Sequence, residues 1–180
     1  PTQRSLLDLM DLHQRQRERL RSLLRQWEAA DKLAAKALQR ALDSFTRADY
    51  LSDDNLGWLG TAGWNKQAMH LAHGHLTRDY TAAFDDLTKM QAEMRKVLET
   101  LEEIDLEVMK GNKDLWKEAR PLMRAEMALR ETLLQSVPLL RRAPDEERRR
   151  VWLLWTERCW CGGTDEGDLL PKLYEALKPE

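Results

Sequence analysis

One stretch of this chain, from Ala83 to Val108, carries apolar residues at alternating steps of four and three positions without a polar interruption. These residues are Ala83, Leu87, Met90, Met94, Val97, Leu101, Ile104 and Val108. A 3.5-residue repeat places them on one side of an α-helix and keeps them facing a neighbouring helix as the two wind around each other. The stretch therefore predicts a long helix over about 77–110, with Thr77 as its N-cap.

The N-terminal stretch carries the same pattern over a still longer helix, which we predict at about residues 5–50. Its apolar or small positions again step by four and three, and Asp31 occupies the one position that breaks the stripe. The stripe consists of Leu20, Leu24, Trp27, Ala34, Leu38, Ala41 and Phe45. Residues 51–76 hold several glycines together with Trp58 and Trp64. Because glycine interrupts helices, we predict a loop there and a long helical hairpin over residues 1–110.

Residues 111–180 predict shorter helices, at about 115–137, 144–160 and 166–178. Gly111 suits the position just after a helix, and Pro138 cannot continue one. Pro144 and the carboxylates that follow it suit a first helical turn, where negative charge meets the positive end of the helix dipole. The fold class is therefore all-α: an elongated antiparallel hairpin or coiled coil, with these shorter helices closing one end.

Two long helices cannot hide all of their apolar surface from water. We therefore expect a third or fourth helix, from a partner protein or from a second copy of the chain, to cover the remaining seam. Leu87, Met90, Met94 and Leu101 lie on the more regular of the two seams and are predicted partner-interface residues. Methionine repacks easily and so suits an adaptable binding surface, but ordinary core packing favours the same residue type at these positions.

Trp152 and Trp155 complete the predicted partner interface. They are three residues apart, so they project from one face of the predicted helix. Large aromatic side chains in such a place either seal the end of a helical assembly or anchor a partner. We expect Trp155 to seal the protein's own base and Trp152 to contact a partner.

Composition and charge exclude several classes of function. A formal net charge of -2 gives no general attraction to nucleic acid or to an anionic membrane. No stretch reaches the roughly 18 uninterrupted apolar residues that a membrane span needs. The first residues, PTQRSLLDLM, lack the charged-then-apolar order of a secretory signal. We therefore expect a soluble protein of the nucleus or cytoplasm.

His70, His73 and His75 form the strongest candidate for a metal site. Histidines three or four residues apart on a helix can converge on one ion, and His70 with His73 meets that spacing. No second cluster of potential ligands completes the site, so a loop or packing role is favoured. A metal-dependent helical enzyme remains the least favoured alternative.

Cysteine and glycine patterns point away from catalysis. Cys159 and Cys161 are the only cysteines, and one intervening residue fits neither a redox pair nor half of a zinc site. Gly57, Gly60 and Gly63 lack the Lys-Ser/Thr sequence of a phosphate-binding loop. We predict no catalytic residue, no cofactor, no metal ligand and no small-molecule substrate.

Several short segments resemble the cyclin-dependent kinase 2-interacting protein family, in the order that the family has them. The run Leu87-Thr88-Lys89-Met90-Gln91, followed by Met94, is similar to the family's central helix. Leu24 with Trp27-Glu28 resembles its first helix. Four residues resemble its third helix, and Trp155 follows in a hydrophobic run after a similar interval; the four are Arg124, Glu126, Leu129 and Thr132.

The resemblance implies a non-catalytic adaptor. Members of that family are linked to cyclin-dependent kinase and replication-checkpoint proteins, and to a complex with AAA-type ATPases that acts in replication-associated proteostasis and ribosome maturation. The resemblance therefore implies such proteins as partners and the nucleus as a location. The helical pattern by itself equally permits a structural homo-oligomeric coiled coil of the kinetochore or centrosome type.

Overall fold

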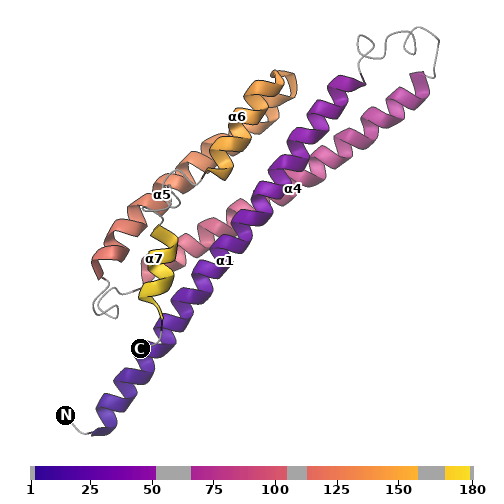
Figure 1. Cartoon of the computed structure of the whole chain (residues 1–180). Coiled ribbons are helices and arrows are strands. Elements are labelled where there is room, and N and C mark those ends of the chain that lie inside the picture. Colours follow the sequence, from indigo (N-terminus) through magenta and orange to yellow (C-terminus); the bar gives the residue numbers. More distant parts are fainter. Residues whose placement is uncertain (1–2, 52–65, 105–112, 158–168, 179–180) are drawn as a thin grey trace.

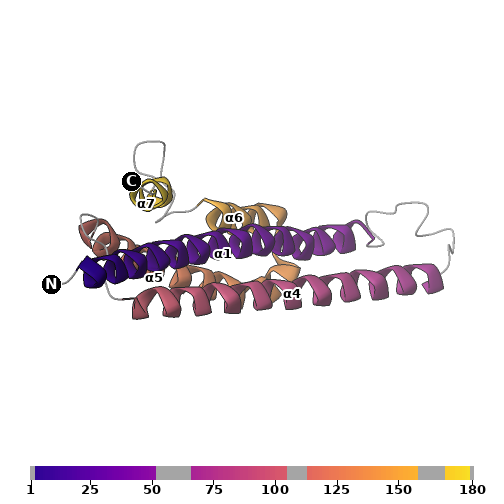
Figure 2. The same ribbon diagram turned by 90° about the horizontal axis from the view of Figure 1, so that it is seen from below.

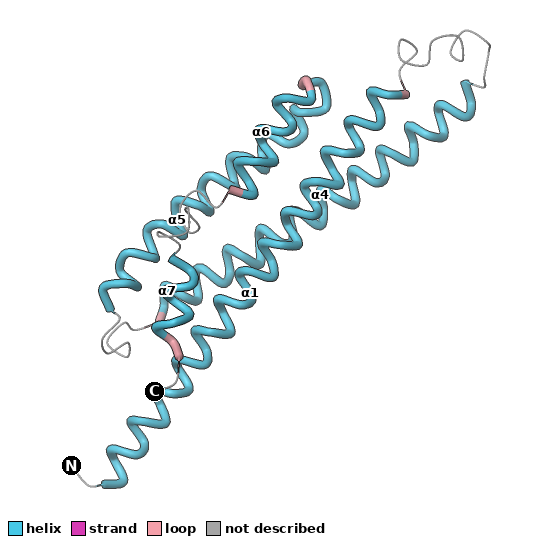
Figure 3. Tube along the Cα trace, in the orientation of Figure 1, coloured by secondary structure: helices cyan, strands magenta, loops and turns pink. Residues whose placement is uncertain are grey.

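A computed structural model describes residues 3–51, 66–104, 113–157 and 169–178, and within them the fold is all-α. The two long helices are α1 (Gln3–Tyr50) and α4 (Lys66–Glu103). The remaining elements are α5 (Lys113–Ser136), the 3-10 helix η2 (Val137–Arg142), α6 (Asp145–Thr156) and α7 (Leu169–Ala176). Every regular element of the described residues is helical (Figure 3).

α1 and α4 lie side by side and run in opposite directions (Figures 1 and 2). Their predicted seams supply the contact. The whole α1 stripe is buried, and so are most seam positions of α4. Met90 on α4 and Ile104 just after its end are half-buried. Arg40 on α1 forms an ion pair of 2.5 Å with Asp86 on α4 at the exposed edge of the pair. The apolar repeat thus packs the two long helices against each other within one chain.

The second long helix begins earlier than the sequence predicts. α4 starts at Lys66, so the predicted loop of 51–76 is wrong for its last part, and Thr77 is not an N-cap. Thr77 lies inside the helix, where its carbonyl accepts a hydrogen bond of 2.9 Å from the Thr81 hydroxyl. Gly74 also lies inside α4, with open space around it. A helical glycine costs only about 1 kcal/mol relative to alanine, which a long helix can absorb.

The third predicted helix ends within one residue of the expected position 137. α5 stops at Ser136, and the chain continues at once into η2. Pro138 lies at the start of η2, where its missing N–H removes no helical hydrogen bond. Pro121 lies within α5, in its exposed face near the N-terminus. α6 then begins after Pro144, as predicted, and carries acidic residues in its first turn.

The C-terminal helices cover one side of the α1–α4 pair, which corrects the expectation that they close one end. Figure 1 shows α5 and α6 lying along the pair, and Figure 2 shows them behind it. α5 contacts α4, and α6 contacts α1. Helices of this chain itself therefore cover that side of the pair, and whether a partner or a second copy adds a further helix stays a prediction. Close packing of this apolar surface stabilises the arrangement.

The buried apolar residues form two clusters that follow one another along α1. The first combines residues of α1, α4, α5 and α7, with Trp27 and Trp116 among its largest members. The second combines α1 and α4 with α5, η2 and α6, and contains Trp155. The predicted segments 1–110 and 111–180 therefore share both clusters. No helix of the described ranges combines the length and apolar character that crossing a bilayer needs.

Some predicted features lie outside the described residues. These are Trp58, Trp64 and the glycines between 52 and 65; Val108 and Gly111; and Cys159 with Cys161.

Candidate functional site

Three of the predicted interface residues belong to the protein's own core. Leu87, Met94 and Leu101 have exposed fractions of 0%, 0% and 1%. Leu87 packs in the second apolar cluster, and the other two pack in the first. Their seam faces α1 and the C-terminal helices, so these residues are not accessible to a partner in this fold. Their assignment as partner-interface residues stays a prediction.

Met90 and Trp155 differ in how deeply they are buried. Met90 is half-buried beside the second cluster. Trp155 is 1% exposed, and the guanidinium carbon of Arg130 lies 5.5 Å from the centre of its ring. A buried aromatic ring with a cation over its face supports the core, which is the sealing role expected for Trp155.

Trp152 has a different environment. It is half-buried at the edge of the second cluster and lines a cleft between α1 and α6 with a volume of about 330 Å³. Its indole nitrogen is buried and has no hydrogen-bond acceptor among the described residues, which is also true of Trp116 and Trp155. Buried Trp N–H groups usually find an acceptor. Trp152 is therefore a predicted interface residue that lines a cleft.

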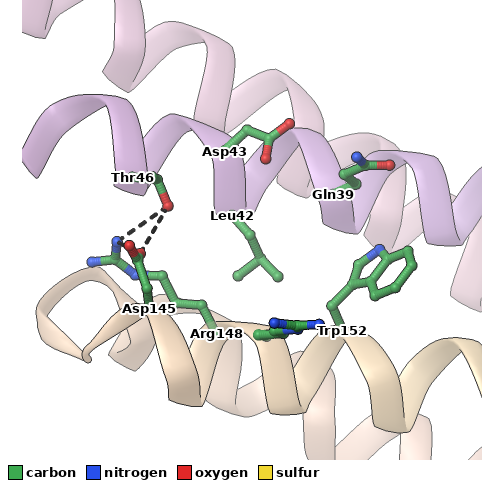
Figure 4. Close-up of a pocket in the computed structure, with 8 residues that line it drawn as sticks. Gln39, Leu42, Asp43, Thr46, Asp145, Arg148 and Trp152 are labelled. Atoms are coloured by element: carbon green, nitrogen blue, oxygen red, sulfur yellow. Dashed lines mark hydrogen bonds and ion pairs between the residues drawn. The ribbon is translucent and has the colours of Figure 1, made fainter. Parts of the chain in front are cut away.

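The cleft has one wall on each helix (Figure 4). α1 contributes Gln39, Leu42, Asp43 and Thr46, and α6 contributes Asp145, Arg148, Arg149 and Trp152. Leu42 points from α1 toward α6 and, with Trp152, supplies the apolar part of the lining. The volume lies at the lower end of the range for ligand pockets. It suits one or two side chains better than a large cofactor.

Arg148 holds the two walls together. Its side chain is 4% exposed and forms ion pairs of 2.6 Å with Asp49 and 3.1 Å with Asp145. Its Nη1 donates a hydrogen bond of 3.4 Å to the Thr46 hydroxyl, which itself donates one of 3.1 Å to Asp145. A buried guanidinium with several acceptors is strongly tied to one geometry. The position of α6 on α1 is thereby set at this point.

The same guanidinium also caps the C-terminus of η2. Arg148 donates hydrogen bonds of 3.0 Å to the Leu140 carbonyl and 3.1 Å to the Arg141 carbonyl. These carbonyls lie near the C-terminus of η2, where intrahelical donors run out. In the sequence, the position of Arg148 three residues after Asp145 indicates this ion pair, because that spacing on a helix lets the two side chains meet.

A second buried polar group lies in the middle of the bundle. Arg130 on α5 is 2% exposed and forms an ion pair of 2.5 Å with Asp31 on α1 and another with Glu126 on its own helix. Sequence reasoning did not find this group, although it noted that Asp31 interrupts an apolar stripe. A charged residue at a core position predicts a buried partner of opposite charge, because burying an unpaired charge costs free energy.

The three candidate histidines lie on α4. His70 and His75 are exposed on α4, and His73 is half-buried. The Nδ1 atom of His75 lies 3.1 Å from a guanidinium nitrogen of Arg78. Within the described part of the chain, no group of three or more His, Cys, Asp or Glu residues is placed to hold a metal ion.

No family model, curated protein sequence or solved structure matches this chain.

Proposed function

We propose that this protein is a non-catalytic helical adaptor subunit of a multiprotein complex. The observation that carries the proposal is the α1–α6 cleft, which a half-buried tryptophan, Trp152, lines beside the apolar side chain of Leu42. Tryptophan is enriched among residues that dominate binding energy at protein interfaces. An interface built on Trp152 requires no catalytic group, metal or cofactor.

The resemblance to the cyclin-dependent kinase 2-interacting protein family gives the proposal its partners. It implies cyclin-dependent kinase or checkpoint proteins, or subunits of a complex with AAA-type ATPases, and a role in replication or ribosome maturation. We propose the nucleus as the place of action on the same basis. A structural homo-oligomer is the alternative that the experiment must separate from this one.

Affinity purification from the native cell, followed by mass spectrometry, tests the proposal. We expect a defined set of proteins to co-purify with the wild-type chain and to be lost with Trp152→Ala. Leu154→Ala is the matched control, because Leu154 lies on the same helix and is 44% exposed. Both variants are first checked for an unchanged helical circular dichroism spectrum.

Light scattering on the purified chain supplies the second measurement. An adaptor is expected to be a monomer until its partner is added. A stable homodimer whose mass does not change with Trp152→Ala, and from which no other protein co-purifies, would overturn the adaptor proposal in favour of a structural homo-oligomer.

A further inference from the structure

Residues on the two walls of the α1–α6 cleft can be compared by their level along the cleft. α6 runs antiparallel to α1 (Figure 1), and Thr46 contacts Asp145. Asp43 lies three residues from Thr46 along α1, and Arg149 lies four residues from Asp145 along α6. At about 1.5 Å per residue, these positions lie within roughly 2 Å of the same level along the cleft. One acidic and one basic residue therefore flank the cleft at the same height.

Asp43 and Arg149 are the two charged residues of the cleft whose charges have no partner among the described residues. Asp145, in contrast, forms an ion pair with Arg148 and accepts a hydrogen bond from Thr46, and the partners of Arg148 are given above. Asp43 and Arg149 are exposed, line the cleft, and have no ion pair or hydrogen bond among the described residues. The cleft thus has an apolar floor, an acidic edge on α1 and a basic edge on α6.

We propose that the cleft binds an amphipathic helix of a partner protein, with an apolar side chain on Leu42 and Trp152, a basic residue beside Asp43 and an acidic residue beside Arg149. This inference rests on the proposed adaptor function and names the kind of partner segment. A groove between two antiparallel helices suits a third helix lying along it, and paired helices select each other through charges that flank an apolar seam. Reversing such a helix exchanges its flanks, so the two edge charges also fix its direction.

Three synthetic peptides test the pattern. Each is an alanine-based helix of about 18 residues, long enough to form a helix in water, with one central leucine. One peptide carries lysine on one flank of the leucine and glutamate on the other; the second carries lysine on both, and the third glutamate on both. Binding is followed by the indole N–H signal of Trp152 in the nitrogen-15-labelled chain, assigned with Trp152→Phe.

Charge-reversed proteins make the test specific. The wild-type chain should prefer the mixed peptide, Asp43→Lys the double-glutamate peptide, and Arg149→Glu the double-lysine peptide. Each matched pair should strengthen binding about two- to fivefold, as expected for exposed ion pairs. Asp43 and Arg149 are exposed and have no ion pair or hydrogen bond among the described residues, so both variants should stay folded with melting temperatures close to that of the wild type. Adding about 0.5 M salt should reduce the preferences.

The outcomes separate this inference from the proposed function. If all three proteins rank the peptides identically, or if none of the peptides shifts the Trp152 signal, the helix-binding inference is overturned. The adaptor proposal would still stand if cellular partners depend on Trp152 in the purification above. If those partners are retained by Trp152→Ala, both proposals fail at this cleft.

Discussion

Arg130 on α5 and Asp31 on α1 form an ion pair of 2.5 Å between side chains that are 2% and 9% exposed. Glu126, equally buried, shares the same guanidinium. One buried cation thus holds two carboxylates, and it joins the C-terminal helices to the longest helix of the protein. Buried ion pairs lose more on desolvation than surface pairs and depend strongly on having every partner present.

Arg130→Met is expected to destabilise the protein by about 3–5 kcal/mol, because it leaves two carboxylates buried without a cation. Urea denaturation followed by circular dichroism measures the change. Arg95→Ala is the control: its ion pair of 2.5 Å with Glu131 is exposed to solvent, so the loss should stay below about 1 kcal/mol. Equal losses for the two variants would contradict the role given to Arg130.

Apolar replacement of the whole group provides an independent check. The triple variant Asp31→Leu, Glu126→Leu and Arg130→Met should recover most of the stability lost in the single variant, because no charge then remains buried. If it is as unstable as the single variant, packing rather than charge explains the loss.

Met94→Asp combined with Leu101→Asp is expected to abolish folding of the isolated chain. Both side chains are almost fully buried in the first apolar cluster, and an unpaired charge there costs several kcal/mol. Circular dichroism and thermal melting measure the result. Lys89→Ala, on the exposed face of the same helix, should change stability by less than about 0.5 kcal/mol. A folded double variant that only fails to bind partners would support the interface assignment.

Trp155→Ala should mainly lower stability, whereas Trp152→Ala should mainly remove partner binding. Trp155 is 1% exposed, so its truncation should lower the free energy of unfolding by about 3–5 kcal/mol. Trp152 is half-buried at the cleft, so its truncation should lower stability by less than half as much while removing partner binding. Urea denaturation of both variants under identical conditions decides the first point. The assignment is wrong if Trp152→Ala is the more unstable protein.

Tyr80 gives the protein a predictable response to alkaline pH. Its ring lies 4.7 Å from that of Phe45 and 5.8 Å from that of Phe84, and burial raises its pKa above the ordinary 10.0, against an opposing effect of Arg141. The unfolded chain therefore loses this proton first as pH rises. Tyr80 is then expected to lower the free energy of unfolding above about pH 10.

Comparison with Tyr80→Phe isolates that contribution, because other groups also titrate at high pH. The fall in stability between about pH 9 and about pH 11 should be smaller in Tyr80→Phe than in the wild-type chain. Identical falls in the two proteins would show that Tyr80 does not contribute.

His70→Ala with His73→Ala should leave folding and partner binding intact, and the purified wild-type protein should contain no stoichiometric zinc, iron or manganese. Elemental analysis of the two proteins is the measurement. Close to one metal ion per wild-type chain, lost in the double variant, would revive the metal-dependent enzyme.

The sequence predicts the all-α class and the facing seams because apolar spacing directly determines which side of a helix is buried. The stripe from Leu20 to Phe45 is buried at every predicted position. The start of α4 could not be predicted because one exposed glycine, Gly74, reads like a helix end when its surroundings are unknown. The side on which α5 and α6 pack depends on tertiary contacts, such as those of Arg148, that no local pattern encodes.

The candidate cleft was only partly predictable. The spacing of Trp152 and Trp155 indicates a shared helix face, but a half-buried and a fully buried tryptophan have the same sequence signature. The opposite charges of Asp43 and Arg149 lie more than a hundred residues apart in sequence. Their juxtaposition follows only from the antiparallel packing of α6 on α1.

α1 passes without interruption through both apolar clusters, and this continuity limits how the protein can be divided. A fragment that ends between the clusters would carry an incomplete core on either side of the cut, because each cluster draws on α1, α4 and α5. The molecule should therefore unfold as a single cooperative unit, without a stable half-folded intermediate. Truncation mapping of partner binding would then report loss of folding, so point substitutions on the intact chain are the sound way to locate its contacts.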